Sequence, residues 1–506
     1  MKKTSVKRNF LYNMLYQLFT MLVPLITTPY ISKVLLPEGV GKYSYTYSIV
    51  NYFILFSQLG LNIYGQREIA KYQDNKLSQS IIFFEILIIK LCTVSISCMT
   101  YILVIPNSWD EYGILFLCWL PLILAQLFDI SFLFQGNENF SKIVFRNFTI
   151  KIIGILSIFI FVKSYDDVWI YILSVSLSNL FGIISTWFYL PQYIVKINVY
   201  NLKPLRHVLP SIKLFIPTIA TVIYAYLDKT LIGVLINDTF VDKEYVLIDG
   251  VEKVSEVVKR YSEIENGYYE QSEKILKVSM SIITALGAVM LPRNTHEFAS
   301  GNHEKLKNNI YTSAGVIFML GMPLTMGLVA ISENLIPWFL GEEFSKCIIY
   351  LRFFSPLVIL FGLDNVFGIQ YLITTNNDKK YSIAIITGTI INILLNLLLI
   401  PKFWGLGAII ASIIAEIIIV LIMYLSIKQE ISFARILYLS YKYILASCIM
   451  YIFVYFTQIN MNSNIMNTFI LIIEGCLIYF GTLIVLKDKL FYDNFIYNRK
   501  NKKVGF

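Results

Sequence analysis

Charged side chains inside apolar runs are the residues of this chain whose types and spacing are best suited to chemistry. Asp228 and Lys229 lie within the apolar run 212–236. The next run, 268–292, carries four charges at i, i+3, i+4 and i+7, which is one face of a helix: Glu270, Glu273, Lys274 and Lys277. Ionisable groups at membrane depth are costly, and they face a cavity, form pairs or mark a pathway. The spacing therefore predicts a polar site shared by the two runs.

Two interpretations of this charged cluster stay open. The amines would bind an anionic group such as a pyrophosphate, and Arg352 in the run 348–372 would contribute to that site, while the carboxylates would couple to an ion. The alternative is a structural network in which Asp228 pairs with Lys274 or Lys277. Both interpretations hold if a pair opens during a conformational cycle.

Polar stripes mark the first two apolar runs. The first stripe contains Asn13, Gln17 and Thr20, and the second contains Ser44, Ser48, Asn51, Gln58 and Asn62. Within each run these positions share one helical face, and polar groups in hydrocarbon are costly without partners. We expect the stripes to line a water-filled cavity. The alternative is hydrogen bonding between packed helices.

The elements that position these residues are membrane-spanning helices. A run of roughly 20 apolar residues crosses a bilayer core as a helix, and the sequence contains fourteen such runs. They are 10–31, 43–64, 81–105, 113–135, 146–163, 168–190, 212–236, 268–292, 310–332, 348–372, 381–400, 405–427, 438–458 and 465–486. Charged residues make up only 15% of the chain, compared with about 25% in soluble proteins. The sequence predicts an all-α polytopic membrane protein with fourteen transmembrane helices.

The basic residues predict the orientation of these helices. An even number of spans puts both termini on one side, and most lysines and arginines of the loops fall on that side. By the positive-inside rule this side is cytoplasmic. The net charge of +9 is therefore expected to set orientation and meet anionic membrane lipids, not to bind nucleic acid.

Two polar segments divide the chain. Residues 1–190 are predicted to form an N-terminal six-helix bundle, followed by a cytoplasmic linker at 191–211. A second six-helix bundle is predicted over 212–430, with an outer loop at 237–266 that we expect to be a small hairpin or helix. Residues 431–506 would add two helices and a basic cytoplasmic tail.

Several catalytic motifs are absent from the sequence. It has no G-x-x-x-x-G-K-[ST], no G-x-S-x-G and no HExxH. The six cysteines form no CxxC pair, and Asp166-Asp167 is interpreted as a solvated turn. His207, His296 and His303 lie in predicted cytoplasmic loops, which makes them poor candidates for an intramembrane proton relay. We expect no enzyme, no metal site and no cofactor.

Specific stretches resemble the Wzx-type polysaccharide flippases of the multidrug/oligosaccharidyl-lipid/polysaccharide export superfamily. The stretches near the N-terminus are Thr28-Pro29-Tyr30-Ile31-Ser32, Pro37-Glu38-Gly39-Val40-Gly41 and Tyr64-Gly65-Gln66-Arg67-Glu68-Ile69-Ala70. Tyr226-Leu227-Asp228-Lys229-Thr230 and the segment 267–275 are similar to the family's seventh and eighth helices. The resemblance covers about residues 8–430, and the loop before Gly267 is longer than in many relatives.

The resemblance implies two six-helix bundles in a V around a central cavity, working by alternating access without ATP hydrolysis. The implied cargo is an undecaprenyl-pyrophosphate-linked oligosaccharide, flipped across a bacterial inner membrane for capsule, exopolysaccharide or O-antigen synthesis. We expect a monomer that works beside the polysaccharide polymerase machinery.

Other functions remain open from the sequence. An ion-coupled multidrug exporter or a lipid II flippase would have the same architecture. A repeat-unit polymerase or ligase is a further alternative, and its catalytic residues would have to lie in the outer loop 237–266. Arg67 and Glu68, at the cytoplasmic end of the second run, are expected to form a gate or a structural pair.

Overall fold

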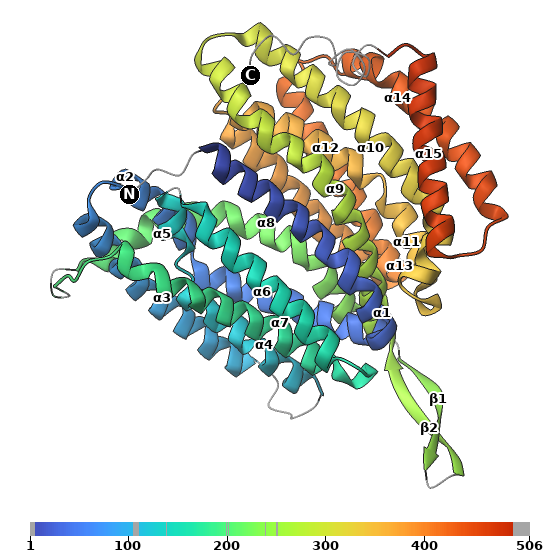
Figure 1. Cartoon of the computed structure of the whole chain (residues 1–506), viewed down its shortest axis with the longest axis horizontal. Helices are drawn as coiled ribbons and strands as arrows, with labels where there is room; N and C mark the ends of the chain where they lie inside the picture. Colours follow the sequence, from blue (N-terminus) through green and yellow to red (C-terminus); the bar gives the residue numbers. More distant parts are fainter. Residues whose placement is uncertain are drawn as a thin grey trace. The chain divides into compact units, whose positions relative to one another are not determined.

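The computed structural model describes residues 6–104, 111–137, 139–198, 200, 202–237, 239–248 and 251–488 (Figure 1). Within these ranges it describes the side chains outside 6–22, 111, 140–146, 217, 239–259, 285–286 and 288–289. The chain divides into two compact units, residues 1–270 and 271–506, which we call unit 1 and unit 2. The predicted bundle boundaries at 190, 211 and 430 remain predictions.

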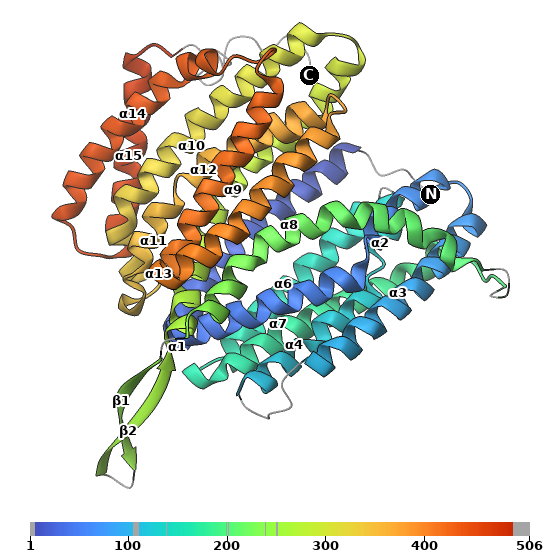
Figure 2. The same cartoon turned by 180° about the vertical axis from the view of Figure 1, so that it is seen from behind.

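Unit 1 is built from α-helices and one β-hairpin. Its helices are α1 (Val6–Gln58), α2 (Leu61–Lys71), α3 (Lys76–Val104), α4 (Glu111–Phe128), α5 (Ser131–Gly136), α6 (Phe140–Phe161), α7 (Val168–Ser185), α8 (Val208–Leu235) and the first turns of α9 (Tyr261–Ala299). Short 3-10 turns, η1 (Tyr165–Asp167), η2 (Thr186–Gln192) and η4 (Pro204–His207), lie between them. Helix α1 contacts α3, α4, α6 and α8, so it is the central helix of the unit (Figure 2).

Helix α1 contains the first two predicted spans and bends between them. Leu36 has φ 57° and ψ 176°, which is not helical, and it directly precedes Pro37. The proline ring disfavours helical geometry at the residue before it and removes a backbone donor. The break at Leu36 therefore separates the two polar stripes.

The predicted outer loop 237–266 contains a β-hairpin, and a small hairpin was one of the two structures expected there. Strands β1 (Thr239–Ile248) and β2 (Val251–Arg260) pair antiparallel, with Lys243 opposite Glu256 and Ile248 opposite Val251. The hairpin extends away from the ends of α8 and α9 (Figure 1). It leads directly into α9.

Unit 2 continues with the rest of α9 and the remaining helices. They are α10 (His303–Phe339), α11 (Cys347–Phe354), α12 (Leu357–Asp364), the π-helical segment η6 (Asn365–Ile373), α13 (Asp378–Ile427), α14 (Phe433–Ile459) and α15 (Ile465–Val485), with a 3-10 turn η5 (Glu342–Phe344). Helix α13 contains two predicted spans and bends at Trp404, where φ is 54°. Helix α14 packs between α10 and α15.

The helices confirm the predicted fold class. Each of the fourteen apolar runs falls on helical segments, with two runs on α1 and two on α13. Among the described residues, nine helices are both long and apolar enough to cross a membrane. The chain is therefore a polytopic helical membrane protein.

Glycines bring α1, α8 and α9 into close contact within unit 1. A Cβ on Gly41 would lie 1.6 Å from the Glu263 carbonyl oxygen, and a Cβ on Gly267 would lie 2.0 Å from the Pro37 oxygen. A Cβ on Gly233 would come within 2.1 Å of the Tyr45 ring. Small residues let membrane helices approach closely. This packing sets the second polar stripe against the charged residues of α8 and α9.

Candidate functional site

A buried ion pair joins α8 to α9 in unit 1. Lys229 Nζ lies 2.5 Å from Glu270 Oε2, and the two side chains are only 4% and 7% exposed. Ser44 on α1 donates a hydrogen bond to the same carboxylate oxygen at 3.0 Å. A buried pair of this kind holds only if further hydrogen bonds satisfy its charges. Three helices thus converge on one carboxylate.

The neighbouring carboxylate, Asp228, is also buried and hydrogen-bonded. Tyr269 donates its hydroxyl to Asp228 Oδ2 at 2.6 Å. Lys277, proposed from sequence as a partner of Asp228, instead pairs with Glu273 at 2.7 Å and is 54% exposed. The predicted cluster therefore contains a buried part on α8 and the start of α9, and a more exposed pair two turns further along α9.

A pocket lies one turn from this ion pair, and we call it the polar pocket because six of its eleven lining residues carry amide or hydroxyl groups. Its volume is about 310 Å³, within the usual range for ligand sites. Asn51 and Gln58 line it, together with Tyr226, which stands three residues before Lys229 and so on the same side of α8. The other lining residues are Ile54, Leu55, Gly60, Asn62, Ile63, Thr218, Thr221 and Val222. Amides, hydroxyls and a phenol are groups that bind sugar hydroxyls.

A fully buried lysine supports the wall of this pocket. Lys90 on α3 is 1% exposed, and its Nζ donates to Asn62 Oδ1 at 2.7 Å and to the Asp129 carbonyl oxygen at 2.5 Å. Asn62 in turn donates to Asp129 Oδ2 at 2.9 Å, and Lys90 lies over the Phe132 ring at 5.2 Å. Lys90 therefore fixes the orientation of the Asn62 amide. Lys90 lies outside the set of site residues predicted from the sequence.

Ser48 contributes to the helix contact near the pocket. Its Oγ lies 2.8 Å from Thr230 Oγ1, and Tyr52 Oη lies 3.1 Å from the same atom. Ser48 also donates to the Tyr45 carbonyl oxygen. Both interpretations of the second stripe therefore apply to part of it. Ser48 forms a hydrogen bond between helices, whereas Asn51 and Gln58 line a pocket.

The other predicted site residues have different surroundings. Arg352 donates to Glu333 Oε1 at 2.6 Å and to Ser332 Oγ at 3.0 Å, within unit 2. Lys274 is half-buried on α9. The side chains of Asn13, Gln17 and Thr20 on α1 lie outside those that the structure describes.

Glu68, which was predicted to act together with Arg67, pairs with Lys71. Glu68 Oε1 accepts a hydrogen bond from Lys71 at 2.6 Å, and Arg67 is exposed. The ion pair at this end of α2 therefore joins Glu68 to Lys71. A gating role for Arg67 and Glu68 remains a prediction.

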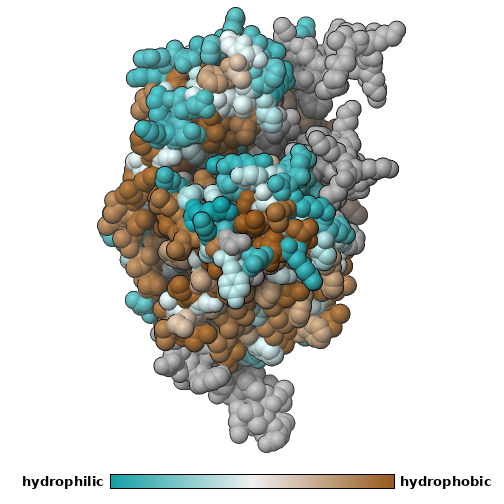
Figure 3. Space-filling view, turned by 90° about the vertical axis from the view of Figure 1, so that its left-hand side faces the viewer, coloured by the Kyte–Doolittle hydropathy of each residue, from teal (hydrophilic) through white to brown (hydrophobic). Residues whose placement is uncertain are grey.

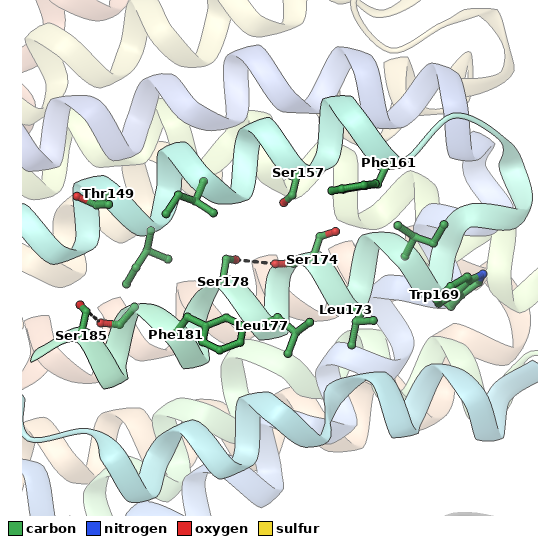
Figure 4. A pocket seen from close by; sticks show the side chains of 14 residues that line it. Thr149, Ser157, Phe161, Trp169, Leu173, Ser174, Leu177, Ser178, Phe181 and Ser185 are labelled. Atoms are coloured by element: carbon green, nitrogen blue, oxygen red, sulfur yellow. Dashed lines mark hydrogen bonds between the residues drawn. The ribbon is translucent and has the colours of Figure 1, made fainter. Parts of the chain in front are cut away.

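A larger groove between α6 and α7 has the wrong chemistry for a polar cargo. Its volume is about 510 Å³ (Figure 4). The hydroxyls of Ser157, Ser178 and Ser185 donate to carbonyl oxygens of their own helices, at 2.8, 2.6 and 2.6 Å. With these donors engaged, the groove offers mainly hydrocarbon. We therefore assign the candidate site to the polar pocket and the ion pair.

Among the described residues, no three or more His, Cys, Asp or Glu side chains are grouped so that they could hold a metal ion. The described groups at the site include the Lys229 ammonium group, the Asp228 and Glu270 carboxylates, amides and hydroxyls.

Sequence comparison shows the family. The chain matches the polysaccharide biosynthesis protein family over residues 6–298, which is more than half its length. It is a member of that family. A second polysaccharide biosynthesis description matches residues 257–349.

Relatives of this polysaccharide biosynthesis protein include transporters. It is 24% identical over 435 residues to a protein of Escherichia coli (strain K12) named "Putative O-antigen transporter", covering 85% of this chain and 98% of that one. It is 28% identical over 165 residues to the Lipid II flippase MurJ of Bacillus subtilis (strain 168), covering 32% of this chain and 30% of that one.

Solved structures share the fold of this family member. The Lipid II flippase MurJ in an inward closed conformation has a TM-score of 0.68 at 17% identity, covering 95% of this chain and 99% of that one. An inward-facing multidrug resistance MATE transporter has a TM-score of 0.64 at 14% identity, covering 83% and 95%. The chain therefore shares the fold of these two solved transporters.

Proposed function

We propose that this protein flips undecaprenyl-pyrophosphate-linked oligosaccharide repeat units from the inner to the outer leaflet. The product would feed capsule, exopolysaccharide or O-antigen synthesis. Membership of the polysaccharide biosynthesis family supports this cargo class, as does the similarity to a protein named for O-antigen transport. The protein would reside in a bacterial inner membrane as a monomer with both termini in the cytoplasm, in contact with anionic lipids and with the polymerase machinery.

The Lys229–Glu270 pair beside the polar pocket is the observation that carries this proposal. Breaking a buried ion pair leaves an uncompensated charge, at a cost of about 3–5 kcal/mol. A pyrophosphate oxygen that replaces the Glu270 carboxylate keeps Lys229 paired, and a proton or cation at Glu270 keeps the carboxylate compensated. Cargo binding would therefore exchange one partner for another while avoiding that cost.

The pocket would bind the sugar part of the cargo. Asn51 and Gln58 would offer amide oxygens, since their NH2 groups donate to the Tyr47 carbonyl oxygen and to Gln126. Tyr226 lines the pocket one helical turn from the cation. An exporter of apolar drugs would instead be expected to have an apolar, aromatic-walled cavity. Six of the eleven lining residues of this pocket carry amide or hydroxyl groups, and these support a saccharide cargo.

The transport cycle would run without ATP. The sequence contains no nucleotide-binding loop of the P-loop type. The driving force would come from an ion gradient, the membrane potential, or the supply and removal of cargo. Asp228 and Glu270 would be the carboxylates of the candidate site that couple to an ion.

Complementation of a host strain that lacks the gene tests the proposed function. The wild-type gene is expected to restore surface polysaccharide and to clear complete repeat units from the inner leaflet. A cell that accumulates unpolymerised repeat units on the outer leaflet would indicate a polymerase instead. Accumulation of lipid II in place of repeat units would indicate a lipid II flippase, and unchanged pools of both would favour the drug exporter.

A further inference from the structure

A second polar pocket lies at the end of unit 1 that carries the turn between α2 and α3. Its volume is about 450 Å³, and it lies where these helices meet the 3-10 turn η4 of the linker. The polar residues that line it are Tyr64, Glu68, Tyr72, Ser78, Glu85, Lys203, Arg206 and His207. This pocket is separate from the candidate cargo site, because the two share no lining residue.

Glu85 organises the linker turn that forms one wall of the pocket. Its side chain is 1% exposed, and Oε1 accepts the backbone N–H of Lys203 at 2.6 Å. Oε2 accepts from Arg206 Nη2 at 2.5 Å and lies 2.7 Å from His207 Nε2. The other ring nitrogen of His207 lies 2.7 Å from the Tyr64 hydroxyl. Both Glu85 oxygens are thus enclosed by donors.

The solvent-accessible charges of this pocket are mainly positive, because Arg206 and Lys203 are exposed. Glu68 is 17% exposed and is paired with Lys71, while Glu85 is inaccessible. Arg206 uses one edge of its guanidinium on Glu85 and is still 52% exposed. Lys203 is exposed, and it reaches Glu85 through its backbone and not through its amine. A ligand that enters the pocket therefore meets a guanidinium and an ammonium group.

Exposed leucines stand close in sequence to the residues that line this pocket. Leu205, between the two cations, and Leu209, two residues after His207, are 83% and 64% exposed, and Leu77 on α3 is 54% exposed. Hydrophilic and hydrophobic residues lie side by side on the face of the molecule where α2 and α5 lie (Figure 3). Cations flanked by exposed leucines match the boundary between lipid headgroups and acyl chains.

We propose that this pocket binds the phosphate headgroup of an anionic membrane lipid. Arg206 and Lys203 would contact the phosphate oxygens, and Leu205 and Leu209 would lie among the acyl chains. Glu85 would act as a positioning residue, because it orders the turn that carries both cations. The site is independent of the cargo and tethers the linker between the sixth and seventh predicted spans to the lipid surface.

Native mass spectrometry of the purified, delipidated full-length protein tests this site. Phosphatidylglycerol and phosphatidylcholine with identical acyl chains are the probes. The wild type is expected to retain phosphatidylglycerol more tightly. Each surface cation contributes about fivefold to binding an anionic lipid, so Lys203→Ala is expected to weaken binding about fivefold and K203A/R206Q more than tenfold.

Matched variants keep this test interpretable. Lys203→Ala leaves the Glu85 contacts intact, because these use its backbone N–H, and Lys213→Ala removes an exposed lysine that does not line the pocket. Unchanged phosphatidylglycerol binding in K203A, or an equal loss in K213A, would overturn the site. Selective displacement of phosphatidylglycerol by undecaprenyl phosphate at this site would overturn the assignment to bulk lipid. A flippase that fails in complementation would leave this binding result unaffected.

Discussion

The two units contain ion pairs of the same chemistry in opposite environments. Lys229 and Glu270 in unit 1 are 4% and 7% exposed, whereas Lys277 and Glu273, further along α9, are 54% and 14% exposed. An exposed i,i+4 pair contributes about 0.3–0.5 kcal/mol, while breaking a buried pair costs about 3–5 kcal/mol. Position along one helix therefore decides how large a free energy is lost when the ion pair is broken.

Removing each lysine sharpens this comparison and gives the largest expected effect. Lys229→Ala is expected to abolish transport and to lower stability by about 3–5 kcal/mol, because the buried Glu270 carboxylate loses the Lys229 ammonium group. Lys277→Ala is the matched control, and we expect about 0.5 kcal/mol or less. Thermal unfolding in detergent and surface polysaccharide in complemented cells measure the two effects. Equal behaviour of the variants would contradict the contrast.

Lys90 extends the comparison to a buried lysine that donates to an amide oxygen and a backbone carbonyl oxygen. In Lys90→Met the Asn62 and Asp129 oxygens lose a donor, and each unsatisfied group costs about 1–3 kcal/mol. We expect reduced thermal stability together with weaker transport, since the Asn62 amide loses its orientation. The control is Lys402→Met, because Lys402 is exposed. Wild-type transport in a stably folded K90M protein would remove Lys90 from the account.

Thiol labelling tests whether the polar stripe of unit 1 lines an accessible pocket. In a background without the six native cysteines, Asn51→Cys is expected to react with a water-soluble thiol reagent, because Asn51 lines the pocket. Val50→Cys is the control, since Val50 is 0% exposed. Protection of both positions during active transport would favour packed helices over a cavity.

The smallest expected effect concerns an exposed pair in unit 2. A hydrogen bond from Tyr371 and the nearby Lys307 amine lower the pKa of Glu430. A lowered pKa contributes stability above the unfolded value, and this contribution is lost as pH falls through the folded value. We expect Glu430→Gln to be slightly less stable than wild type at pH 7, and the difference to shrink as pH falls through the folded-state pKa of Glu430. A difference that does not change as pH falls would contradict this cause.

The fold could be predicted from the sequence because bilayer thickness sets the length of each apolar run. The outer hairpin was one of two expected forms for its loop. The prolines and the backbone geometry at Leu36 explain why two spans appear as the single helix α1. The lengths of the apolar runs are thus enough to predict most of the helices of this fold.

The site could be predicted only in part. Helical spacing indicated the face that carries Glu270, but it cannot give the rotation of α9 against α8, so the partner of Lys229 was not predicted. Glu85 and His207 are separated by 122 positions, and a histidine assigned to a loop proved to be 3% exposed. Contacts between distant segments depend on packing, which periodicity within one run does not report.

The most direct measurement of the central claim uses a variant in which both charges of the buried pair are neutralised. Lys229→Met combined with Glu270→Gln removes the unpaired charge and is expected to recover the stability that Lys229→Ala loses. If Lys229 binds the pyrophosphate of the cargo, this double variant folds but leaves complete repeat units on the inner leaflet of complemented cells. Restored surface polysaccharide in the double variant would contradict that role, because it would show that the pair serves only to stabilise unit 1.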